Sequence, residues 1–378
     1  MPLCQMSYSE NAPSDFHFGI KNIFLTGATG FIGAHLLVNI LHHTDARVMC
    51  LVLGGSIPEA TQRLAVGLER HQLTVDWSRV SIVLGDLTQP FFGMSDIDYD
   101  NLKQKIDLII HAGADVSLFP KYEQLKAVNV DGLGRVLELA NGGKRIPVTH
   151  LSSNSVFNEI SYREDQVVLE EPLRCTEPIF RNGYAESKWR AERLCNAAHA
   201  AGAPVKILRL PYILGAASTG TCNPSGYVDL ILKAVLLTSM APQLDFSLTC
   251  LPVDICADLV VRISLHSQAN PYIFHLTPLA PFHWSEICEA ASNYVHNLEH
   301  LPVFEWHQHI KKCALTQREL FRVVSLLAQD PSLVQFRSNI YRLRFDTTHL
   351  TPYLGEAPAL PQGRSAYLRR YMESVAKV

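Results

Sequence analysis

A tyrosine and a lysine stand four positions apart in the string NGYAESKWRAERL, residues 182 to 194. On a helix, residues i and i+4 project from one face with their Cβ atoms about 6 Å apart. A lysine ammonium about 4 Å from a phenol favours the phenolate by up to ~4 kcal/mol at an effective dielectric of about 20. One pKa unit corresponds to about 1.4 kcal/mol. The spacing therefore predicts that Lys188 lowers the pKa of Tyr184 by at most about one to three units, toward the working range of a general acid.

A serine further upstream can complete this pair. The string HLSSNSVF ends an expected strand, and within it Ser153 is placed to hold a carbonyl oxygen beside the phenol. Each of the three residues also has an ordinary structural interpretation: Ser153 as a turn serine, Tyr184 as a core aromatic and Lys188 as a solvated helix lysine. Taken singly, each ordinary interpretation is favoured, so the assignment depends on the surrounding motifs.

One of these motifs is a glycine-rich turn near the N-terminus. TGATGFIG supplies Gly27, Gly30 and Gly33 directly after an apolar run and at the start of an amphipathic helix. Without side chains there, the pyrophosphate of a dinucleotide can approach the backbone amides and the positive end of the helix dipole. A tight turn without any ligand also tolerates such a triplet. The flanking strand and helix favour a cofactor site, and the order of glycine turn, strand-end serine and Y-x-x-x-K favours one shared catalytic site.

The end of the second expected strand bears on which dinucleotide is used. A site that prefers NAD normally places an acid there for the ribose 2'-hydroxyl, whereas this strand ends in LVLGG, residues 51–55. Arg63 on the following helix is the nearest cation that could bind a 2'-phosphate, and a solvated arginine is an equally good interpretation. Asp86, after the third strand, could accept a hydrogen bond from the adenine amine or simply cap its loop.

These residues need a scaffold of alternating strands and helices, and the apolar pattern supplies one. Strands are expected over 22–27, 47–55, 79–87, 106–114, 147–157 and 204–215, with helices over 31–43, 59–72, 99–105, 122–142 and 184–202. Such alternation predicts an α/β fold, a Rossmann-type doubly wound parallel sheet with helices on both faces. The expected division is an N-terminal tail or linker (1–20), an NADP-binding domain (21–211) and a smaller, mostly helical substrate region (212–378), of which residues 250–262 could return to the main sheet.

The composition argues against several classes of protein. Of the 378 residues, 47% are hydrophobic and 18% charged, which is the profile of a globular chain. The formal net charge is -3 and there is no basic stripe, so nucleic-acid binding is not expected. No apolar run approaches the ~18 to 20 residues that span a bilayer, and the N-terminus lacks the pattern of a signal peptide. Nine cysteines without a C-x-x-C pair indicate a reduced, cytoplasmic setting.

Other possible sites have weaker support. His275, His283, His307 and His309 lack a companion H-x-x-E or cysteine cluster, so ordinary histidines are favoured and no metal site is expected. No G-x-S-x-G elbow supports hydrolase chemistry. The amphipathic string YVDLILKAVLL, residues 227–237, could line an acyl tunnel or dock a carrier, although a helix packed on its own domain is the simpler interpretation.

Together, the glycine triplet and the Ser153, Tyr184 and Lys188 set resemble the extended short-chain dehydrogenase/reductase superfamily. Narrower strings are FLTGATGFIGAHLL, AVNVDGLGRVLELA, LSSNSVF, GYAESKWRAE and LPVDICADLV. They are similar to the terminal thioester reductase domains of nonribosomal peptide and polyketide synthases, and to the reductase domain of carboxylic acid reductases. The resemblance covers residues 21–262 well and the remainder loosely, and GYAESKWRAE is its most specific part.

The resemblance implies a monomeric domain that uses NADPH to reduce an acyl or peptidyl thioester held on the phosphopantetheine arm of a carrier protein. Ser153 and Tyr184 would stabilise the oxyanion, with Tyr184 as proton donor and Lys188 lowering its pKa and binding the nicotinamide ribose. The product would be an aldehyde, which a second reduction would convert to a primary alcohol. The implied cofactor-binding residues are Thr26, Gly27, Thr29, Gly30, Phe31, Ile32, Gly33, Arg63, Asp86, Leu87, Ala112, Gly113, Ala114, Asn129, Tyr184, Lys188 and Pro211.

Two positions depart from the family pattern. The L-V-R string that usually ends the second strand has Leu53 in place of arginine, which weakens the expected discrimination against NADH and leaves Arg63 as the basic residue. After the sixth strand the family commonly has R-P-G, whereas here Arg209 is followed by Leu210, Pro211 and Tyr212. Tyr212 is therefore expected to reshape the nicotinamide side or the substrate side of the site.

Several alternatives share the same residues. A fatty acyl-CoA reductase and a nucleotide-sugar epimerase or dehydratase carry the same triad, and some relatives release their product by carbon-carbon cyclisation without reduction. A non-catalytic NADP-sensing scaffold is an alternative of a different class, against which the intact Tyr184 and Lys188 argue. The acyl substrate and the number of reduction steps stay open at this point.

Overall fold

A computed structural model describes residues 19–117, 120–157, 166–174, 179–180, 182–266, 270–329, 343–354, 360 and 362–377. The tail expected at residues 1–20 lies outside these ranges except for its last two residues. Within them, no helix is long and apolar enough to cross a bilayer. The same ranges contain no group of three or more side chains placed to hold a metal ion.

Seven parallel strands form the central sheet, in the order β12-β7-β5-β4-β1-β2-β3. They are β1 (Asn22–Thr26), β2 (Arg47–Val52), β3 (Val80–Leu84), β4 (Leu108–His111), β5 (Val148–Ser153), β7 (Val205–Leu210) and β12 (Ile273–His275). From β1 the chain adds strands first on one side and then on the other. In such a sheet the order reverses between β1 and β4, and ligands bind at the carboxyl ends of the strands on either side of that point.

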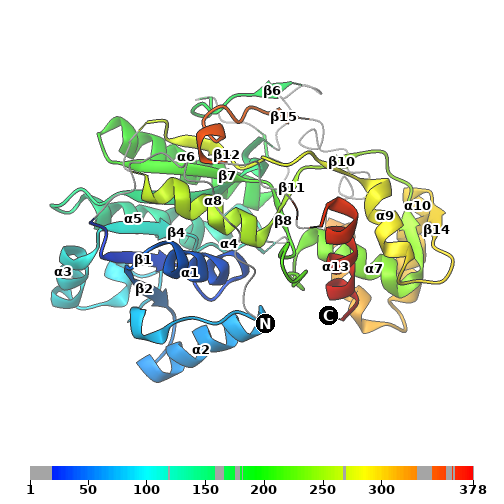
Figure 1. The fold of residues 1–378 in the computed structure, drawn as a ribbon, viewed down its shortest axis with the longest axis horizontal. Helices are drawn as coiled ribbons and strands as arrows, with labels where there is room; N and C mark the ends of the chain where they lie inside the picture. The colour runs from blue at the N-terminus through cyan, green and yellow to red at the C-terminus, as the bar shows by residue number, and fades with distance from the viewer. Residues whose placement is uncertain are drawn as a thin grey trace.

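Helices cover both faces of the sheet (Figure 1). One layer contains α1 (Phe31–His43), α2 (Ile57–Arg70) and α8 (Val253–Leu265), and the other contains α3 (Asp96–Lys105), α5 (Gly132–Asn141) and α6 (Gly183–Ala200). Ile23 and Leu25 of β1 belong to the core of the first layer, whereas Phe24 belongs to the core of the second. Successive side chains of a strand point to opposite faces, so both layers are packed on an apolar sheet. The predicted doubly wound α/β fold is confirmed.

The single helix expected over residues 122–142 is divided. It consists of α4 (Tyr122–Lys126), a π-helical turn (Ala127–Asp131) and α5, in continuous succession. Such π-turns widen a helix locally and occur often at functional sites. This one contains the buried Asn129, whose contacts are described with the site.

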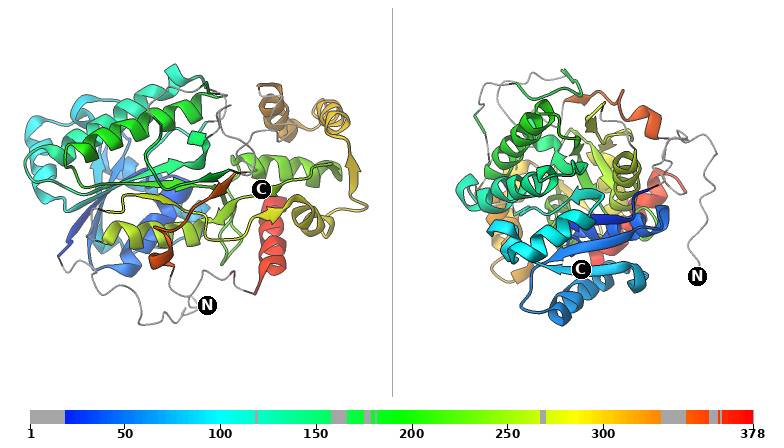
Figure 2. Two further views of the ribbon diagram at one scale, coloured as in Figure 1. Left: turned by 90° about the horizontal axis from the view of Figure 1, so that it is seen from above. Right: turned by 90° about the vertical axis from the view of Figure 1, so that its left-hand side faces the viewer.

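The remaining helices build a smaller part beside the sheet (Figures 1 and 2). They are α7 (Tyr227–Thr238), α9 (Trp284–Ser292), α10 (Val303–Cys313), α11 (Phe321–Gln329) and α13 (Arg364–Lys377). Their shared core contains the buried rings of Trp306, Tyr367 and Tyr371. A short parallel pair, β8 (Tyr212–Leu214) and β11 (Cys250–Pro252), lies between this core and the main sheet.

The sequence left open that residues 250–262 return to the main sheet, but they add no strand to it. Their first residues form β11, which pairs with β8, and the rest begin α8, which packs against α1. The buried Cys256, Ala257, Val260 and Val261 recur at the spacing of one helix face, which explains the helix. The strand that does join the main sheet is β12, which pairs with β7.

Candidate active site

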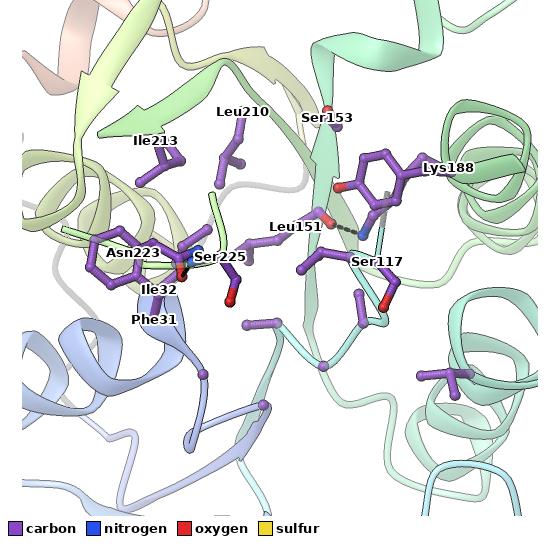
Figure 3. Close-up of a pocket in the computed structure, with 18 of the residues that line it drawn as sticks. Phe31, Ile32, Ser117, Leu151, Ser153, Lys188, Leu210, Ile213, Asn223 and Ser225 are labelled. Atoms are coloured by element: carbon purple, nitrogen blue, oxygen red, sulfur yellow. Dashed lines mark hydrogen bonds between the residues drawn. The ribbon is translucent and has the colours of Figure 1, made fainter. Parts of the chain in front are cut away.

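Ser153, Tyr184 and Lys188 meet at the carboxyl edge of the sheet. Ser153 is the last residue of β5, and the first two turns of α6 carry the other two. Asn182 caps α6 by accepting a hydrogen bond from the N–H of Ala185 at 2.8 Å. The Ser153 side chain acts to lower the pKa of Tyr184. All three predicted catalytic side chains line one cavity of about 1500 Å³, with Ser153 and Lys188 on the same side of the opening (Figure 3).

The residue before Tyr184 must be glycine for a steric reason. A Cβ at Gly183 would lie 2.3 Å from the backbone nitrogen of Tyr122 and 2.8 Å from the carbonyl oxygen of Pro120. Backbone atoms cannot move aside as a flexible side chain could. Gly183 therefore allows the first turn of α6 to approach α4 closely, which fixes the position of Tyr184.

The electrostatics of the pair differ from the expectation. The Lys188 ammonium donates a hydrogen bond to the Leu151 carbonyl oxygen at 2.8 Å and lies 6.0 Å from the centre of the Tyr184 ring. Burial raises the pKa of Tyr184 to about 12, against the opposing effect of the Ser153 side chain. Burial also lowers the pKa of Lys188 to about 8. The predicted lowering of the Tyr184 pKa by Lys188 is wrong for this structure: burial is the main cause and raises the pKa, while the Lys188 ammonium is bonded to the Leu151 carbonyl.

The glycine turn packs tightly against the end of β4. Gly27 has a φ of +76°, and a Cβ there would lie 2.7 Å from the backbone nitrogen of Gly113. A Cβ at Gly33 would lie 2.0 Å from the carbonyl oxygen of Gly27. Gly30, which precedes α1, has no side chain with which to cap the helix. The first amides of α1 therefore stay accessible to an anion, so the turn fits a dinucleotide pyrophosphate.

Most of the predicted cofactor residues line the same cavity. They are Gly27, Thr29, Gly30, Phe31, Ile32, Gly33, Arg63, Asp86, Leu87, Ala112, Gly113, Ala114, Tyr184, Lys188 and Pro211. The cavity runs from the glycine turn past Ser153 to the C-terminal helices, and Figure 3 shows Phe31 and Ile32 opposite Ser153 and Lys188.

Thr26 and Asn129 support the wall of the cavity without lining it. Thr26 Oγ1 accepts a hydrogen bond from the Gly113 N–H at 3.0 Å. Asn129 Oδ1 accepts one from the Asp115 N–H at 2.7 Å, and its Nδ2 donates to Ser187 Oγ at 3.0 Å. These contacts hold the loop after β4 against β1 and α6. The sequence pattern could not distinguish a supporting residue from a lining one.

Two arginines line the end of the cavity near β2, away from the catalytic residues. Arg63 Nη1 donates to the Leu53 carbonyl oxygen at 3.4 Å, so its guanidinium lies at the end of β2. Arg70, which no sequence motif singled out, lines the cavity from the same helix two turns later. Asp86 Oδ1 accepts hydrogen bonds from the Thr88 N–H and hydroxyl, both at 2.8 Å. Asp86 thus caps its loop, as the simpler interpretation held, while also lining the cavity.

The C-terminal helices contribute residues that the sequence did not single out. Tyr227 and Leu230 of α7 line the cavity, as do Arg322 and Leu326 of α11. The string 227–237 carried a weak signal for the first two, since it could have lined an acyl tunnel. Nothing in the pattern of α11 indicated that it would reach the site.

A buried ion pair lies under the catalytic edge. Glu192 of α6 and Arg209 of β7 are 2.8 Å apart, and both side chains are fully buried. Glu192 also accepts a hydrogen bond from the Ser152 hydroxyl, and Arg209 contacts the His275 ring at 3.1 Å. The pair therefore connects α6 with three neighbouring strands, β5, β7 and β12.

Comparison with known proteins identifies the family of the chain. Residues 25–260 match the family NAD_binding_4, described as Male sterility protein. One subunit of the linear gramicidin synthase from Brevibacillus parabrevis is 32% identical over 307 residues, which are 81% of this chain and 6% of that protein. The chain thus spans a small fraction of that large synthase polypeptide.

Solved structures extend the likeness to nearly the whole chain. The terminal R domain from the myxalamid PKS-NRPS biosynthetic pathway is 30% identical, with a TM-score of 0.86 over 95% of this chain and 91% of that one. A thiolation-reductase di-domain from an archaeal non-ribosomal peptide synthetase is 20% identical, with a TM-score of 0.76 over 96% of this chain and 77% of that one, and shares the fold. The chain belongs to the NAD_binding_4 family and is an NAD(P)-binding oxidoreductase domain of the extended short-chain dehydrogenase/reductase type, related to the terminal reductase domains of nonribosomal peptide and polyketide synthases.

Proposed function

We propose that this chain reduces an acyl or peptidyl thioester, carried on the phosphopantetheine arm of a carrier protein, to an aldehyde and in some cases to a primary alcohol. The observation that supports this most directly is the shared cavity, in which the glycine turn and the Ser153, Tyr184 and Lys188 set are continuous with the C-terminal helices. Its volume of about 1500 Å³ exceeds the ~300 to 1000 Å³ common for one small ligand. The site therefore has room for a dinucleotide and an acyl thioester together.

The proposed cofactor is NADPH, which supplies the hydride when bound. The amides after Gly30 would hold the pyrophosphate, and Lys188 the nicotinamide ribose. Arg63 at the end of β2 would bind the 2'-phosphate, because the strand end itself, LVLGG, carries no acidic residue. The Glu59 carboxylate accepts a hydrogen bond from the Gly55 N–H at 2.9 Å and does not line the cavity. Discrimination against NADH rests on this single guanidinium contact at the strand end, with Leu53 beside it.

Ser153 and Tyr184 would act on the thioester carbonyl. Two hydroxyl donors at one oxygen stabilise the negative charge that develops there, more strongly in the transition state than in the ground state. Because the pKa of Tyr184 is about 12, the phenol is protonated at neutral pH and can donate its proton to that oxygen. Hydride addition to the carbonyl carbon and this proton on its oxygen would give a hemithioacetal. Its C–S bond then breaks, the hydroxyl proton passes to the departing thiolate of the carrier arm, the aldehyde is released, and solvent returns a proton to Tyr184.

A carrier protein is the proposed partner. The relatives include part of a gramicidin synthase and the terminal R domain of a PKS-NRPS pathway, and a thiolation-reductase di-domain shares the fold. We propose that the helices beyond residue 212, apart from α8, form the side of the site that receives the substrate.

A panel of acyl-pantetheine thioesters with NADPH tests the proposal. The wild type should oxidise NADPH in step with formation of aldehyde or alcohol, identified by mass. Tyr184→Phe should lose at least about 100-fold in kcat, because it lacks the donated proton. Tyr99→Phe, a buried tyrosine outside the cavity, is the matched control and should keep its activity. Full turnover by Tyr184→Phe, or turnover of a sugar nucleotide without net NADPH oxidation, would contradict the proposal.

A further inference from the structure

Tyr212 lies just beyond the catalytic edge of the sheet. Leu210, the last residue of β7, is the register partner of Ser153 at the end of β5. Tyr212 follows two residues later and begins β8, where the chain leaves the main sheet. Its N–H donates to the Thr249 carbonyl oxygen at 3.3 Å, and β8 pairs with β11 from this residue onward. The backbone of Tyr212 is therefore fixed one step past Ser153, in the direction of the C-terminal helices.

The side chain of Tyr212 faces the same cavity as the catalytic residues. Its ring is half-buried and lines the cavity together with Ser153 and Tyr184. Because Tyr212 follows two residues after the register partner of Ser153 and lines the same cavity, it lies on the wall next to the catalytic edge.

A second ring fixes the orientation of the first. Tyr227, the first residue of α7, is buried, and its ring centre lies 5.9 Å from that of Tyr212 with 31° between the planes. One turn further along α7, Leu230 lines the cavity as well, and Leu326 joins it from α11. These four residues, Tyr212, Tyr227, Leu230 and Leu326, are called the acyl wall below. Rigid rings give a large apolar contact at little cost in side-chain entropy.

Charged groups are sparse on this side of the cavity. The carboxylates among its described lining residues are Asp86, Glu123 and Glu186, all of which precede residue 212. Among the described residues after 212, the charged lining side chain is Arg322, which is exposed. An apolar chain can be buried against the acyl wall, whereas a cationic one would lose its hydration there and meet Arg322 as a like charge, with no carboxylate among the described lining residues after 212.

We propose that the acyl wall selects the substrate: the site binds thioesters of apolar acyl chains several carbons long, and Tyr212 is the residue that contacts the chain next to the carbonyl. This inference rests on the proposed thioester reduction and narrows it to a class of acyl group.

Acetyl-, hexanoyl- and 6-(trimethylammonio)hexanoyl-pantetheine test this inference, since the first is too short to reach along the wall and the third ends in a cation, for which the described lining residues after 212 offer no carboxylate. The wild type should favour hexanoyl over both by about tenfold or more in kcat/KM. Tyr212→Gly should lower kcat/KM for hexanoyl by about tenfold, mainly through KM, and should lower it for acetyl by less than about threefold. Tyr212→Phe, which keeps the ring, should restore the preference for hexanoyl.

Two outcomes would overturn the inference. Equal loss on acetyl and hexanoyl would mean that Tyr212 acts on the chemical step alone, and unchanged hexanoyl kinetics would mean that it does not contact the chain. Calorimetric titration of the same variants with hexanoyl-pantetheine separates this inference from the proposed function. Weaker binding to Tyr212→Gly would support the acyl wall even if no thioester were reduced, and equal binding would reject it.

Discussion

The Glu192 carboxylate and the Arg209 guanidinium form an ion pair, 2.8 Å between Oε2 and Nη2, with no exposed surface on either side chain. A second bond runs from Arg209 Nε to Glu192 Oε1 at 3.0 Å. Removing both charges from water is costly, and a pair with several hydrogen bonds offsets that cost only while both partners are present. The pair therefore joins α6, which carries Tyr184 and Lys188, to the strand that precedes Tyr212.

Removing one partner of this ion pair should lower the free energy of unfolding much more than replacing both. Glu192→Ala leaves the buried Arg209 charge unpaired and should reduce the free energy of unfolding by ~3 to 5 kcal/mol. Glu186→Ala is the matched control on the same helix, because its pair with Arg190 is partly exposed and should be worth less than ~1 kcal/mol. Urea unfolding of both variants and of Glu192→Met/Arg209→Met measures this. A double variant less stable than Glu192→Ala would contradict the explanation.

Two glycine-to-alanine changes should differ in their effects: one should weaken NADPH binding, and the other should raise the free energy of unfolding. Gly33→Ala places a Cβ 2.0 Å from the Gly27 carbonyl oxygen, so the glycine turn must open and NADPH binding should fall by at least about tenfold. Gly134→Ala, within α5, meets no atom within 4 Å and should stabilise the chain by up to ~1 kcal/mol. Fluorescence titration with NADPH and thermal unfolding give the two readouts. Unchanged NADPH affinity in Gly33→Ala would show that the turn does not hold the cofactor.

The alkaline limb of the pH profile should report Lys188. The pKa of Lys188 is about 8 and that of Tyr184 about 12, so the ammonium is lost first as the pH rises. The kcat/KM profile reports groups of the free enzyme. Reductase activity toward a thioester should therefore fall above about pH 8, while the tyrosine is still protonated. A profile that stays flat to about pH 10 would assign the ammonium no part in the reaction.

The lowered pKa of Lys188 also predicts how the free energy of unfolding depends on pH. Lys188 has a lower pKa in the folded chain than its ordinary value of 10.5. Between about pH 8 and 10.5 the unfolded chain therefore binds more protons, so the contribution of Lys188 to the free energy of unfolding rises with pH across this window. The rise should be on the order of 3 kcal/mol. Urea unfolding of the wild type and of Lys188→Met at each end of the window isolates it. If the difference in free energy of unfolding between the two proteins were the same at both pH values, the lowered pKa of the buried Lys188 ammonium would be contradicted.

Arg63 should decide the choice between the two nicotinamide cofactors. Arg63→Ala should raise KM for NADPH by about tenfold, since a charge-assisted contact to phosphate is lost, and should leave KM for NADH nearly unchanged. Arg47→Ala, at an exposed arginine outside the cavity, is the control. Steady-state kinetics with both cofactors measures the ratio. Equal changes for NADPH and NADH would remove Arg63 from the 2'-phosphate site and leave Arg70 as the remaining arginine at that end.

The sequence was most informative where a local pattern determines structure. The helix expected over residues 31–43 has those bounds in α1, because one apolar face and a glycine start define it. Ser153, Tyr184 and Lys188 could be grouped because Ser153 ends a strand and the other two lie in the first two turns of a helix, and parallel strands bring such points to one edge. The triad and most of the glycine-turn residues therefore meet as the sequence suggested.

Other features depend on distances that no local pattern contains. Whether Lys188 lies against Tyr184 or bonds to Leu151 depends on the depth at which α6 packs. The strand β12 is three residues long, too short to show a period, and its partner β7 is distant in the chain. Tyr227 joins the site through the fold of a region that the motifs cover only loosely.

The placement of β12 has a consequence for how the chain is made. The edge strand next to β7 is supplied by residues 273–275, after the chain has passed through β8, α7 and α8. A ribosome that has released only the first 211 residues has produced a sheet with an open edge at β7 and with no α8 against α1. Unpaired strand edges invite association with other chains. The main sheet is thus complete only after α7 and α8 have been made, and a product that stops before residues 273–275 would be expected to aggregate before it could bind a dinucleotide.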